Sequence, residues 1–293
     1  MNFYLGYHGR SFKLSIFFDR VGGSVFMGQN SDGTFTEIRQ LVARDVDMNN
    51  KLKLSSLFAI VQDTANAQCM EFGCGWKDLM TKYNVCYILS RMRFELNKHP
   101  GAGDSILIRT WPNNNMKAIF TRYFTVEDLD GNVFGSAISQ WALFDVKKRG
   151  VIRPSECGIV FPDVVAKEEP FSLPKGAMYS PEVFETAKVR ECERFPSYAD
   201  FDYNRHVNNA KYVEWAEETL PLEFFAEGKQ ISSIDIKYKH EISFDEYIHK
   251  TPAESMLKME CAYDDGVYCI RSILPDGREG IQCVINKGSK EVI

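Results

Sequence analysis

The sequence predicts an α+β fold in which one long helix followed by antiparallel strands occurs twice. A helical repeat of apolar residues begins at Leu54 and ends before Gly73. Strand-like segments separated by turn residues follow it, and the same order returns after a proline-rich stretch at 154–183. A chain of 293 residues with 44% hydrophobic and 13% aromatic residues is long enough to bury the cores of two domains.

Residues 1–33 are expected to stand outside this fold. Turn signals interrupt the segment, and its apolar positions have no clear period. Met27 is a candidate for the true start of the protein, and a genuine N-terminal arm is the alternative. The apolar run at 14–18 is too short for a signal peptide, and no stretch approaches a membrane span. We therefore expect a soluble, cytoplasmic protein.

The first half, 34–153, is predicted to form one domain. Thr34 to Val46 has a strand pattern, and the helix that follows repeats apolar residues at three- or four-residue steps. The strands expected after it are rich in β-branched and aromatic residues, and Pro-Gly, Pro-Asn and Asp-Gly pairs separate them. They are 87–96, 105–111, 119–128 and 132–143. This order fits a sheet wrapped around a helix.

The second half, 184–293, repeats this order behind an extended linker. Phe184 to Arg194 is predicted to be a strand, Asp202 to His206 a loop, and Val207 to Leu220 a helix. The strands expected after the helix are 231–242, 255–263, 267–274 and 280–285. Both halves therefore have one architecture.

The stretch that begins at Asp202 carries the strongest chemical signal. Asp202, Asn204 and His206 occupy alternate positions directly before a helix. An acid, an amide and an imidazole beside the free N–H groups of a helix N-terminus, near Val207, supply the groups that acyl transfer requires. Asp and Asn are also ordinary cap and turn residues, so the pattern alone leaves a structural role open.

An altered copy of this motif lies in the first half. Asp47, Asn49 and Lys51 align with the three polar residues of the second half, and Leu52 aligns with Val207. The acid and the amide are retained, and lysine replaces histidine. This pattern is expected of a duplicated domain in which one site works and the other has lost its function.

Composition excludes several other classes of protein. A net charge of −5 argues against general nucleic-acid binding. The eight cysteines show no CxxC pair and no zinc-ligand spacing, so we expect no metal site. Nothing points to export, so we expect reduced thiols. No cofactor is expected either. The turn Asp264-Asp265-Gly266 favours a hairpin that places Cys261 opposite Cys269.

With these residues in view, the sequence resembles the acyl-acyl carrier protein thioesterases of plants and bacteria. The segment from Asp202 to Tyr212 matches the C-terminal signature of that family, and Tyr238 to Glu241 resembles its downstream Tyr-x-x-Glu strand. Blocks of the first half also match: 89–92, 103–105, 110–111, 139–141 and 147–149. The resemblance covers about residues 35–290.

The resemblance implies two tandem hotdog domains, each an antiparallel sheet wrapped around a long helix. The catalytic group would lie in the second domain, and the first would be an inactive copy that binds the acyl chain. The substrate would be a fatty acyl thioester of acyl carrier protein, hydrolysed to free fatty acid. Assembly as a homodimer is left open. Several plant members carry a cysteine directly after the glutamate, and Ile242 stands there in this chain, which excludes a thiolate nucleophile at that position.

Four residues are the expected catalytic group: Asp202, Asn204, His206 and Glu241. Either Asp202 or Glu241 would activate water, or Asp202 would attack directly. Asn204 would hold the carboxylate or the substrate carbonyl, and His206 would polarise or protonate. Strand alternation places Glu241 on the solvent face unless a bulge re-aims it, whereas the resemblance implies a catalytic role.

The resemblance also implies substrate and partner contacts in the first half. The acyl chain would lie against Phe58, Val61 and Ala65 of the long helix. The acidic carrier protein would dock on basic side chains. The candidates are Arg91, Arg93, Lys98, Arg122, Lys147, Lys148 and Arg149.

Three other interpretations remain open at this stage. A hotdog acyl-coenzyme A thioesterase would share the chemistry and differ in the carrier. A non-catalytic acyl-binding module would bind without turnover. A hotdog dehydratase would act on the β-carbon of the acyl chain.

Overall fold

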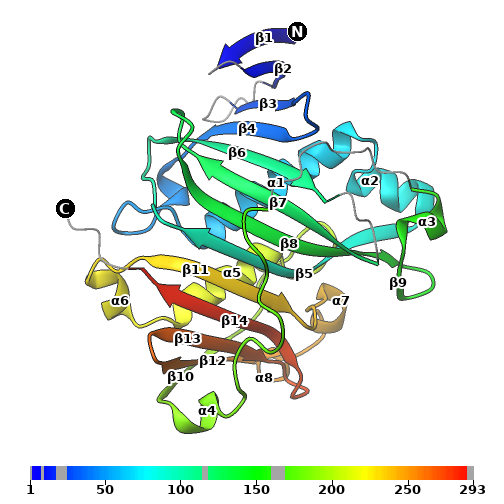
Figure 1. Ribbon diagram of the computed structural model, residues 1–293. Helices are drawn as coiled ribbons and strands as arrows, with labels where there is room; N and C mark the ends of the chain where they lie inside the picture. The colour runs from blue at the N-terminus through cyan, green and yellow to red at the C-terminus, as the bar shows by residue number, and fades with distance from the viewer. Residues whose placement is uncertain (1, 8–9, 18–24, 114–117, 160–168, 289–293) are drawn as a thin grey trace. The chain divides into compact units, whose positions relative to one another are not determined.

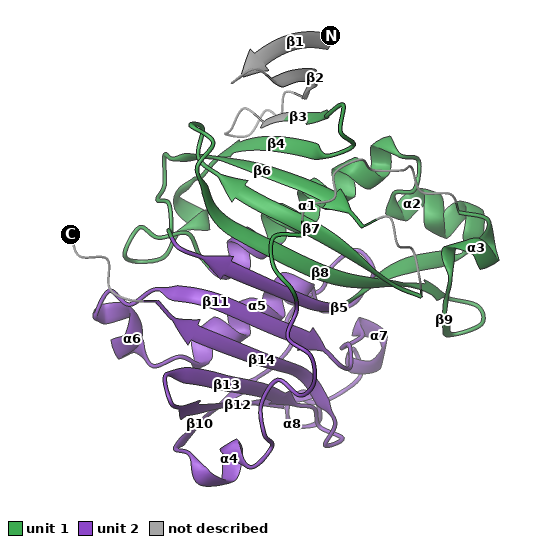
Figure 2. Ribbon diagram, viewed as in Figure 1, with its two compact units in different colours: residues 1–53, 59–90, 98–172 green, residues 54–58, 91–97, 173–293 purple. Residues whose placement is uncertain are grey.

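The computed structural model describes residues 2–7, 10–17, 25–113, 118–159 and 169–288. The chain divides into two compact units (Figure 2). Unit 1 comprises residues 1–53, 59–90 and 98–172, and unit 2 comprises 54–58, 91–97 and 173–293. The division assigns the first turn of the long helix α1 and the second half of strand β5 to unit 2.

Unit 1 contains an antiparallel sheet and most of helix α1 (Figure 1). The strands pair in the order β3-β4-β6-β7-β8, and β9 pairs with β8. The helix packs on this sheet, and the Thr64 hydroxyl donates a hydrogen bond of 2.5 Å to Glu37 of β4. The elements are β3 Val25–Gln29, β4 Phe35–Gln40, α1 Leu54–Glu71, β5 Val85–Leu96, β6 Ser105–Pro112, β7 Ile119–Glu127, β8 Val133–Asp145 and β9 Gly150–Ile152.

Unit 2 repeats the arrangement with helix α5 against a second antiparallel sheet. The second half of β5 begins the strand order β5-β11-β14-β13-β12-β10. Val213 and Ala216 of α5 are fully buried, since the apolar stripe of this helix forms part of the core. The elements are β10 Val189–Arg194, α5 Asn209–Thr219, β11 Ile231–Tyr238, β12 Leu257–Asp264, β13 Val267–Ile273 and β14 Glu279–Lys287.

Short elements complete the described chain. Part of the segment 1–33 forms the strands β1 and β2, which pair with each other, while β2 also pairs with β3 and β3 with β4. Residues 1, 8–9 and 18–24 of that segment lie outside the described residues. The remaining elements are β1 Asn2–Tyr7, β2 Arg10–Phe17, η1 Ala43–Asp45, α2 Trp76–Asp78, η2 Leu79–Tyr83, α3 Pro154–Cys157, α4 Val183–Thr186, η3 Tyr198–Asp200, α6 Leu222–Ala226, α7 Phe244–Tyr247 and α8 Pro252–Ser255. No helix in the described part of the chain is long and apolar enough to cross a bilayer.

A carboxylate from another helix caps the start of α1. Lys53 precedes the helix and offers no capping side chain. The two oxygens of Glu217, on α5, accept the free N–H groups of Leu54 and Ser55 at 2.9 and 3.1 Å. A negative charge at a helix N-terminus also stabilises the helix through its dipole. The first turn of α1 is thereby attached to α5.

Two local predictions were wrong, and the structure gives the reasons. The strand predicted over 34–46 ends at Gln40, because Asp45 accepts the Val42 N–H and closes a 3₁₀ turn. The strand predicted from Phe184 begins only at Val189. Val183 and Phe184 belong to a short helix, where they pack against the cluster around Ala262 and Cys269. Tertiary packing here overrides strand propensity.

The hairpin at 264–267 forms as predicted, but its register is shifted by one residue. Its loop is the two-residue turn Asp265-Gly266, with φ of +42° and +85°. Cys269 therefore lies opposite Ala262, and Cys261 lies opposite Ile270. A one-residue offset places Cys261 and Cys269 on opposite faces of the sheet.

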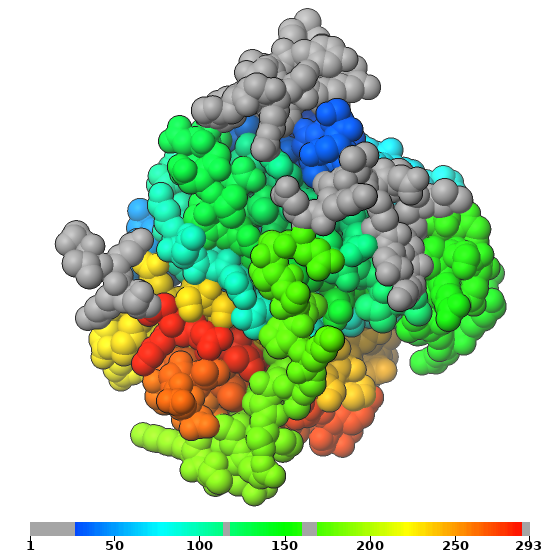
Figure 3. Space-filling model, viewed as in Figure 1, coloured from blue at the N-terminus to red at the C-terminus, as the bar shows by residue number. Residues whose placement is uncertain are grey.

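The segment between the two halves has little regular structure. Residues 160–168 lie outside the described residues, and 169–182 form no helix or strand. Within unit 2 the carbonyl oxygens of Pro174 and Gly176 accept hydrogen bonds from Arg91 and Lys237 at 2.9 and 3.1 Å. Figure 3 shows this yellow-green segment on the surface of the unit.

A buried ion pair joins β5 to β11 within unit 2. The Arg91 guanidinium donates two hydrogen bonds to the Asp235 carboxylate, at 2.8 and 2.6 Å. Arg93 adds a longer contact of 3.4 Å to the same carboxylate. Because both side chains of the main pair are nearly inaccessible to solvent, each charge requires the other.

We expect Asp235→Ala to lower the free energy of unfolding by about 3–5 kcal/mol, since it leaves a buried guanidinium without its counter-charge. Urea unfolding followed by circular dichroism measures the loss. Asp276→Ala is the matched control, because the Asp276–Arg278 pair is solvent-exposed and should contribute little. Equal losses in the two variants would show that burial does not determine how much an ion pair contributes to stability.

Candidate active site

Asp202 shapes the loop that precedes α5. Its Oδ1 accepts the N–H groups of Asn204 and His206 at 2.8 and 3.3 Å. The Asp202 N–H donates to the His206 carbonyl at 2.9 Å, and Arg205 turns the chain at a φ of +65°. A carboxylate that accepts N–H groups ahead of it in this way forms an Asx turn. The first role of Asp202 is therefore to fix the backbone of Asn204 and His206.

A second segment lies against this loop and brings Glu241 to His206. The Val207 N–H donates to the Ile242 carbonyl at 2.9 Å, and the Phe244 N–H donates to the Arg205 carbonyl at 2.7 Å. Between these bonds, His206 Nδ1 lies 3.2 Å from Glu241 Oε2. The side chains of His206 and Glu241 are 36% and 58% exposed, so water reaches both.

The interruption of β11 explains why simple alternation fails for Glu241. The strand ends at Tyr238, and the N–H groups of Lys239 and His240 both donate to the Gly280 carbonyl, at 2.8 and 3.1 Å. Two residues that share one partner act as a bulge, which reverses the facing of the residues beyond it. The bulge therefore re-aims Glu241 toward the histidine, which is one of the two outcomes that the sequence left open.

Two buried tyrosines hold the parts of the site together. The Tyr238 hydroxyl donates to the Asn209 carbonyl at the start of α5, at 3.0 Å. The Tyr212 hydroxyl accepts the Ile242 N–H at 3.1 Å, and burial raises its pKa, so that it stays neutral. Their rings pack at 5.8 Å. In the sequence analysis both tyrosines were only part of the family motifs. Their structural role was missed, because nothing in the sequence shows what their hydroxyl groups bind.

The N–H groups near Val207 are already hydrogen-bonded, so the prediction that they stabilise an oxyanion is wrong. Val207 donates to Ile242, and Asn208 donates to the Asp200 carbonyl at 2.8 Å. The Asn208 side chain in turn caps α5 by accepting the Ala210 N–H at 2.8 Å. Asn204, by contrast, is exposed, two positions before His206 in the loop.

Unit 1 contains the same turn with different side chains. Asp47 Oδ1 accepts the N–H groups of Asn49 and Lys51 at 2.8 and 3.0 Å, and the Asp47 N–H donates to the Lys51 carbonyl at 2.8 Å. Asn50 has a φ of +56°, matching Arg205. The alignment of the two motifs is therefore also a correspondence of backbone geometry.

The correspondence extends to the second segment. The Leu52 N–H donates to the Pro100 carbonyl at 2.9 Å, as Val207 does to Ile242, so His99 occupies the position of Glu241. The ring of His99 is buried and contacts the Leu52 carbonyl at 3.1 Å through Nδ1. Unit 1 thus has lysine and histidine where unit 2 has histidine and glutamate.

The residues predicted to bind the acyl chain are packed core side chains. Phe58 and Val61 are fully buried, and Ala65 is nearly so. The ring of Phe58 packs against Phe94 at 4.8 Å within unit 2. Their contact with substrate stays a prediction.

The predicted docking residues fall into two groups. Arg91 and Arg122 are buried, and Arg93 contacts Glu95 and Asp235, so these guanidinium groups do not form an accessible basic surface. Lys147, Lys148 and Arg149 are exposed in the turn between β8 and β9. Lys98, the remaining candidate, is also exposed, so a partner can reach it as well as the three residues of this turn.

A small polar pocket of about 200 Å³ adjoins the acid of the site. It opens beside Glu241 and contains both acidic and basic groups. Its lining residues are Glu241, Glu246, Tyr247, Lys250, Leu274, Pro275, Asp276 and Arg278.

Comparisons with known proteins identify the family that this chain resembles. Family models for the acyl-ACP thioesterase N-terminal and C-terminal domains match residues 33–157 and 185–271. An acyl-[acyl-carrier-protein] hydrolase of Cuphea viscosissima is 24% identical over 75% of this chain, and a palmitoyl-acyl carrier protein thioesterase of Gossypium hirsutum is 23% identical over 84%. The matches span only 55% and 61% of those relatives' own length.

Solved structures show the same fold. An acyl-ACP thioesterase from Bacteroides thetaiotaomicron superposes with a TM-score of 0.74 at 21% identity, covering 87% of this chain and 98% of the other. A 12:0-ACP thioesterase from Umbellularia californica superposes with a TM-score of 0.69 at 21% identity, covering 88% and 98%. The tandem hotdog architecture predicted from the sequence is thus confirmed.

Proposed function

The chain belongs to the acyl-ACP thioesterase family, and on that premise we propose that it hydrolyses fatty acyl thioesters of acyl carrier protein to free fatty acid. The observation that supports this most directly is the His206–Glu241 pair, at 3.2 Å in the half that matches the family's C-terminal domain. The relatives named above carry names for the same activity. A cytoplasmic location and a homodimer stay predictions from the sequence.

In the proposed mechanism His206 is the general base. Glu241 accepts the Nδ1–H of the ring, which leaves Nε2 as the basic nitrogen and holds its orientation. Nε2 takes a proton from water as the oxygen attacks the thioester carbonyl carbon. The carbon–sulfur bond then breaks, and the imidazolium returns the proton to the departing thiolate.

Asp202 and Asn204 have supporting roles in this scheme. Asp202 positions the histidine, because its Oδ1 already holds the backbone of the turn. The exposed amide of Asn204 donates a hydrogen bond to the substrate carbonyl as it gains negative charge. This scheme assigns the attack on the thioester carbonyl to water and not to the Asp202 carboxylate.

The exposed basic turn is the proposed docking surface for the carrier. Asp145 anchors the turn by accepting the N–H groups of Lys147 and Lys148, both at 2.9 Å. The lysine side chains therefore stand on a fixed backbone. Acyl carrier protein is acidic, so complementary charge would speed the encounter and fix its orientation.

We expect His206→Ala and Glu241→Gln each to lower kcat by about 10²–10⁴ with the fold intact, because each removes part of the acid–base group. Steady-state thiol release, beside circular dichroism of each variant, measures this. The matched controls are Lys51→Ala and His99→Gln, which occupy the corresponding positions of unit 1 and should keep wild-type kcat if they fold. Full activity of His206→Ala would exclude the mechanism.

Matched substitutions of Asp202 and Asp47 distinguish the contribution of the turn to stability from its contribution to catalysis. Asp47→Asn and Asp202→Asn each weaken the same pair of hydrogen bonds, so we expect similar losses of stability, on the order of 1 kcal/mol. Only Asp202→Asn should also lower kcat, because only that turn carries the histidine. Thermal unfolding and thiol release on both variants test this, and equal loss of activity would contradict it.

The substrate itself is tested by thiol release from acyl carrier protein thioesters of several chain lengths and from the matching coenzyme A esters. We expect a higher kcat/KM for the carrier esters, since they add protein–protein contacts to the same reacting bond. A preference for coenzyme A esters would reassign the substrate and keep the chemistry. No release from either series would overturn the proposed function.

The docking surface predicts a selective effect of charge reversal. Lys147→Glu with Lys148→Glu should raise KM for carrier esters by roughly tenfold and leave coenzyme A esters unaffected, and added salt should reduce the difference. Lys188→Glu with Arg190→Glu, at exposed positions of unit 2, is the control. An equal effect from the control pair would place docking elsewhere.

A further inference from the structure

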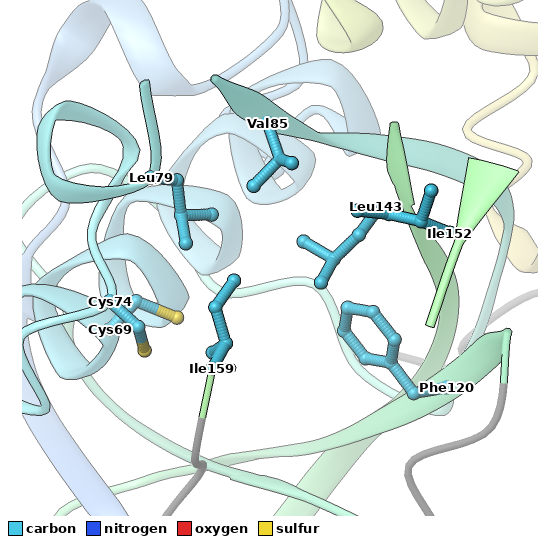
Figure 4. Packing of buried hydrophobic residues seen from close by; sticks show 8 residues of the cluster. All are labelled: Cys69, Cys74, Leu79, Val85, Phe120, Leu143, Ile152 and Ile159. Carbon is cyan, nitrogen blue, oxygen red and sulfur yellow. The ribbon is translucent and has the colours of Figure 1, made fainter. Parts of the chain in front are cut away.

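The C-terminal end of α1 brings two cysteines into contact. The Gly73 N–H donates to the Met70 carbonyl at 3.1 Å, and the Cys74 N–H donates to the Cys69 carbonyl at 3.0 Å. With Gly73 at a φ of +69°, this is a Schellman motif, in which the side chains flanking the second bond pack together. In most proteins these two positions are apolar; here both are cysteine. Figure 4 shows their sulfur atoms side by side at the edge of the unit 1 core.

A buried arginine faces the first of these thiols. Arg122 of β7 donates to Gln68 Oε1 at 2.6 Å, to Thr110 Oγ1 at 3.2 Å and to Cys69 Sγ at 3.5 Å. Among the described residues, none of its hydrogen-bond partners is a carboxylate. A buried guanidinium without a counter-charge is strongly unfavourable. Cys69 is the one partner of the three that ionises, and its thiolate would supply the missing charge.

Three titratable or charged groups face Cys69, and each of them lowers its pKa: Cys74, Arg122 and Tyr87. A hydrogen bond from the Cys74 thiol, together with the charge of Arg122, lowers the pKa of Cys69 to about 6. The same contact raises the pKa of Cys74, so that one thiol of the pair stays protonated. Tyr87, whose hydroxyl donates to the Cys74 carbonyl at 3.1 Å, stays neutral because burial raises its pKa.

We propose that Cys69 and Cys74 form a peroxide-sensitive dithiol, in which Cys69 is the reacting thiolate and Cys74 the resolving thiol. The thiolate attacks one oxygen of hydrogen peroxide and breaks the O–O bond, giving a sulfenic acid and hydroxide, which takes up a proton to become water. The Cys74 sulfur then attacks the sulfenic sulfur. A second water leaves, and a disulfide remains. The two sulfur atoms are oxidised by two electrons in total, and one peroxide is reduced.

The geometry permits both steps. A disulfide requires Cα atoms about 4.4–6.8 Å apart, and the 3.0 Å backbone bond between the two residues keeps them close. Cys69 is 8% exposed and Cys74 4%. Hydrogen peroxide is close to water in size, so a brief opening of the last turn of α1 suffices for entry.

The chain contains its own matched control. Cys261 and Cys269 are also buried thiols, but desolvation raises the pKa of Cys261 to about 11 and raises that of Cys269 as well. They lie on opposite faces of their hairpin. We expect both to stay reduced under conditions that oxidise Cys69.

The experiment treats the reduced full-length protein with hydrogen peroxide, then alkylates the free thiols and maps tryptic peptides by mass spectrometry. Both cysteines lie on one peptide, residues 54–77. The expected product lacks two hydrogens and carries no alkyl group at either cysteine. Fragment spectra distinguish it from oxidation of Met70, which lies between them. The rate should rise with pH through about 6 and then level off, as the thiolate forms.

Variants identify the role of each group. Cys74→Ala should stop the reaction at a sulfenic acid on Cys69, trapped with dimedone, and Cys69→Ser should leave Cys74 reduced. Arg122→Gln should slow the oxidation roughly tenfold near the pKa of Cys69, and Arg122→Lys should restore part of the rate. Oxidation of Cys261 or Cys269 as fast as Cys69, or a bridge from Cys69 to Cys157, which packs on the same cluster, would overturn the proposal.

Discussion

A single carboxylate oxygen, Oδ1 of Asp202, determines the geometry of the candidate site. By holding the N–H groups of Asn204 and His206 it fixes a tight turn, and the turn leaves the flanking backbone free to pair with the segment at 242–244. That pairing in turn sets Glu241 beside the histidine. The same turn at Asp47 carries no imidazole, so the aspartate is first a requirement of the fold. Unit 2 adds an imidazole to a structural element that both units contain.

The sequence predicted the architecture because its signals are local. The apolar repeat of α1, the turn residues between strands and the aligned motifs at Asp47 and Asp202 each depend on residues close in the chain. Glu241 illustrates where such reasoning stops. Its orientation depends on two N–H groups sharing the carbonyl of Gly280, a residue on another strand. No periodicity within β11 contains that information.

The arginines show a second limit of sequence reasoning. From the sequence alone, Arg91 and Arg122 are expected to be surface charges. Both are buried, and their charges are stabilised in different ways. Arg91 has a bidentate carboxylate partner, whereas Arg122 is surrounded by an amide, a hydroxyl and a thiol. Only the three-dimensional environment separates these cases from Lys147 and Lys148, which are exposed as their charge suggests.

The pairing of β5 with β11 has a consequence for the ability of the second half of the chain to fold alone. Unit 2 includes residues 54–58 and 91–97 from the first half of the sequence. A polypeptide beginning at residue 173 would retain the candidate catalytic residues, but it would expose the edge of β11 and leave Asp235 without Arg91. An uncovered edge strand with a bare buried carboxylate is prone to aggregation and loss of structure. The second half of the chain therefore depends on two short segments of the first half, 54–58 and 91–97, to complete its sheet and to neutralise Asp235.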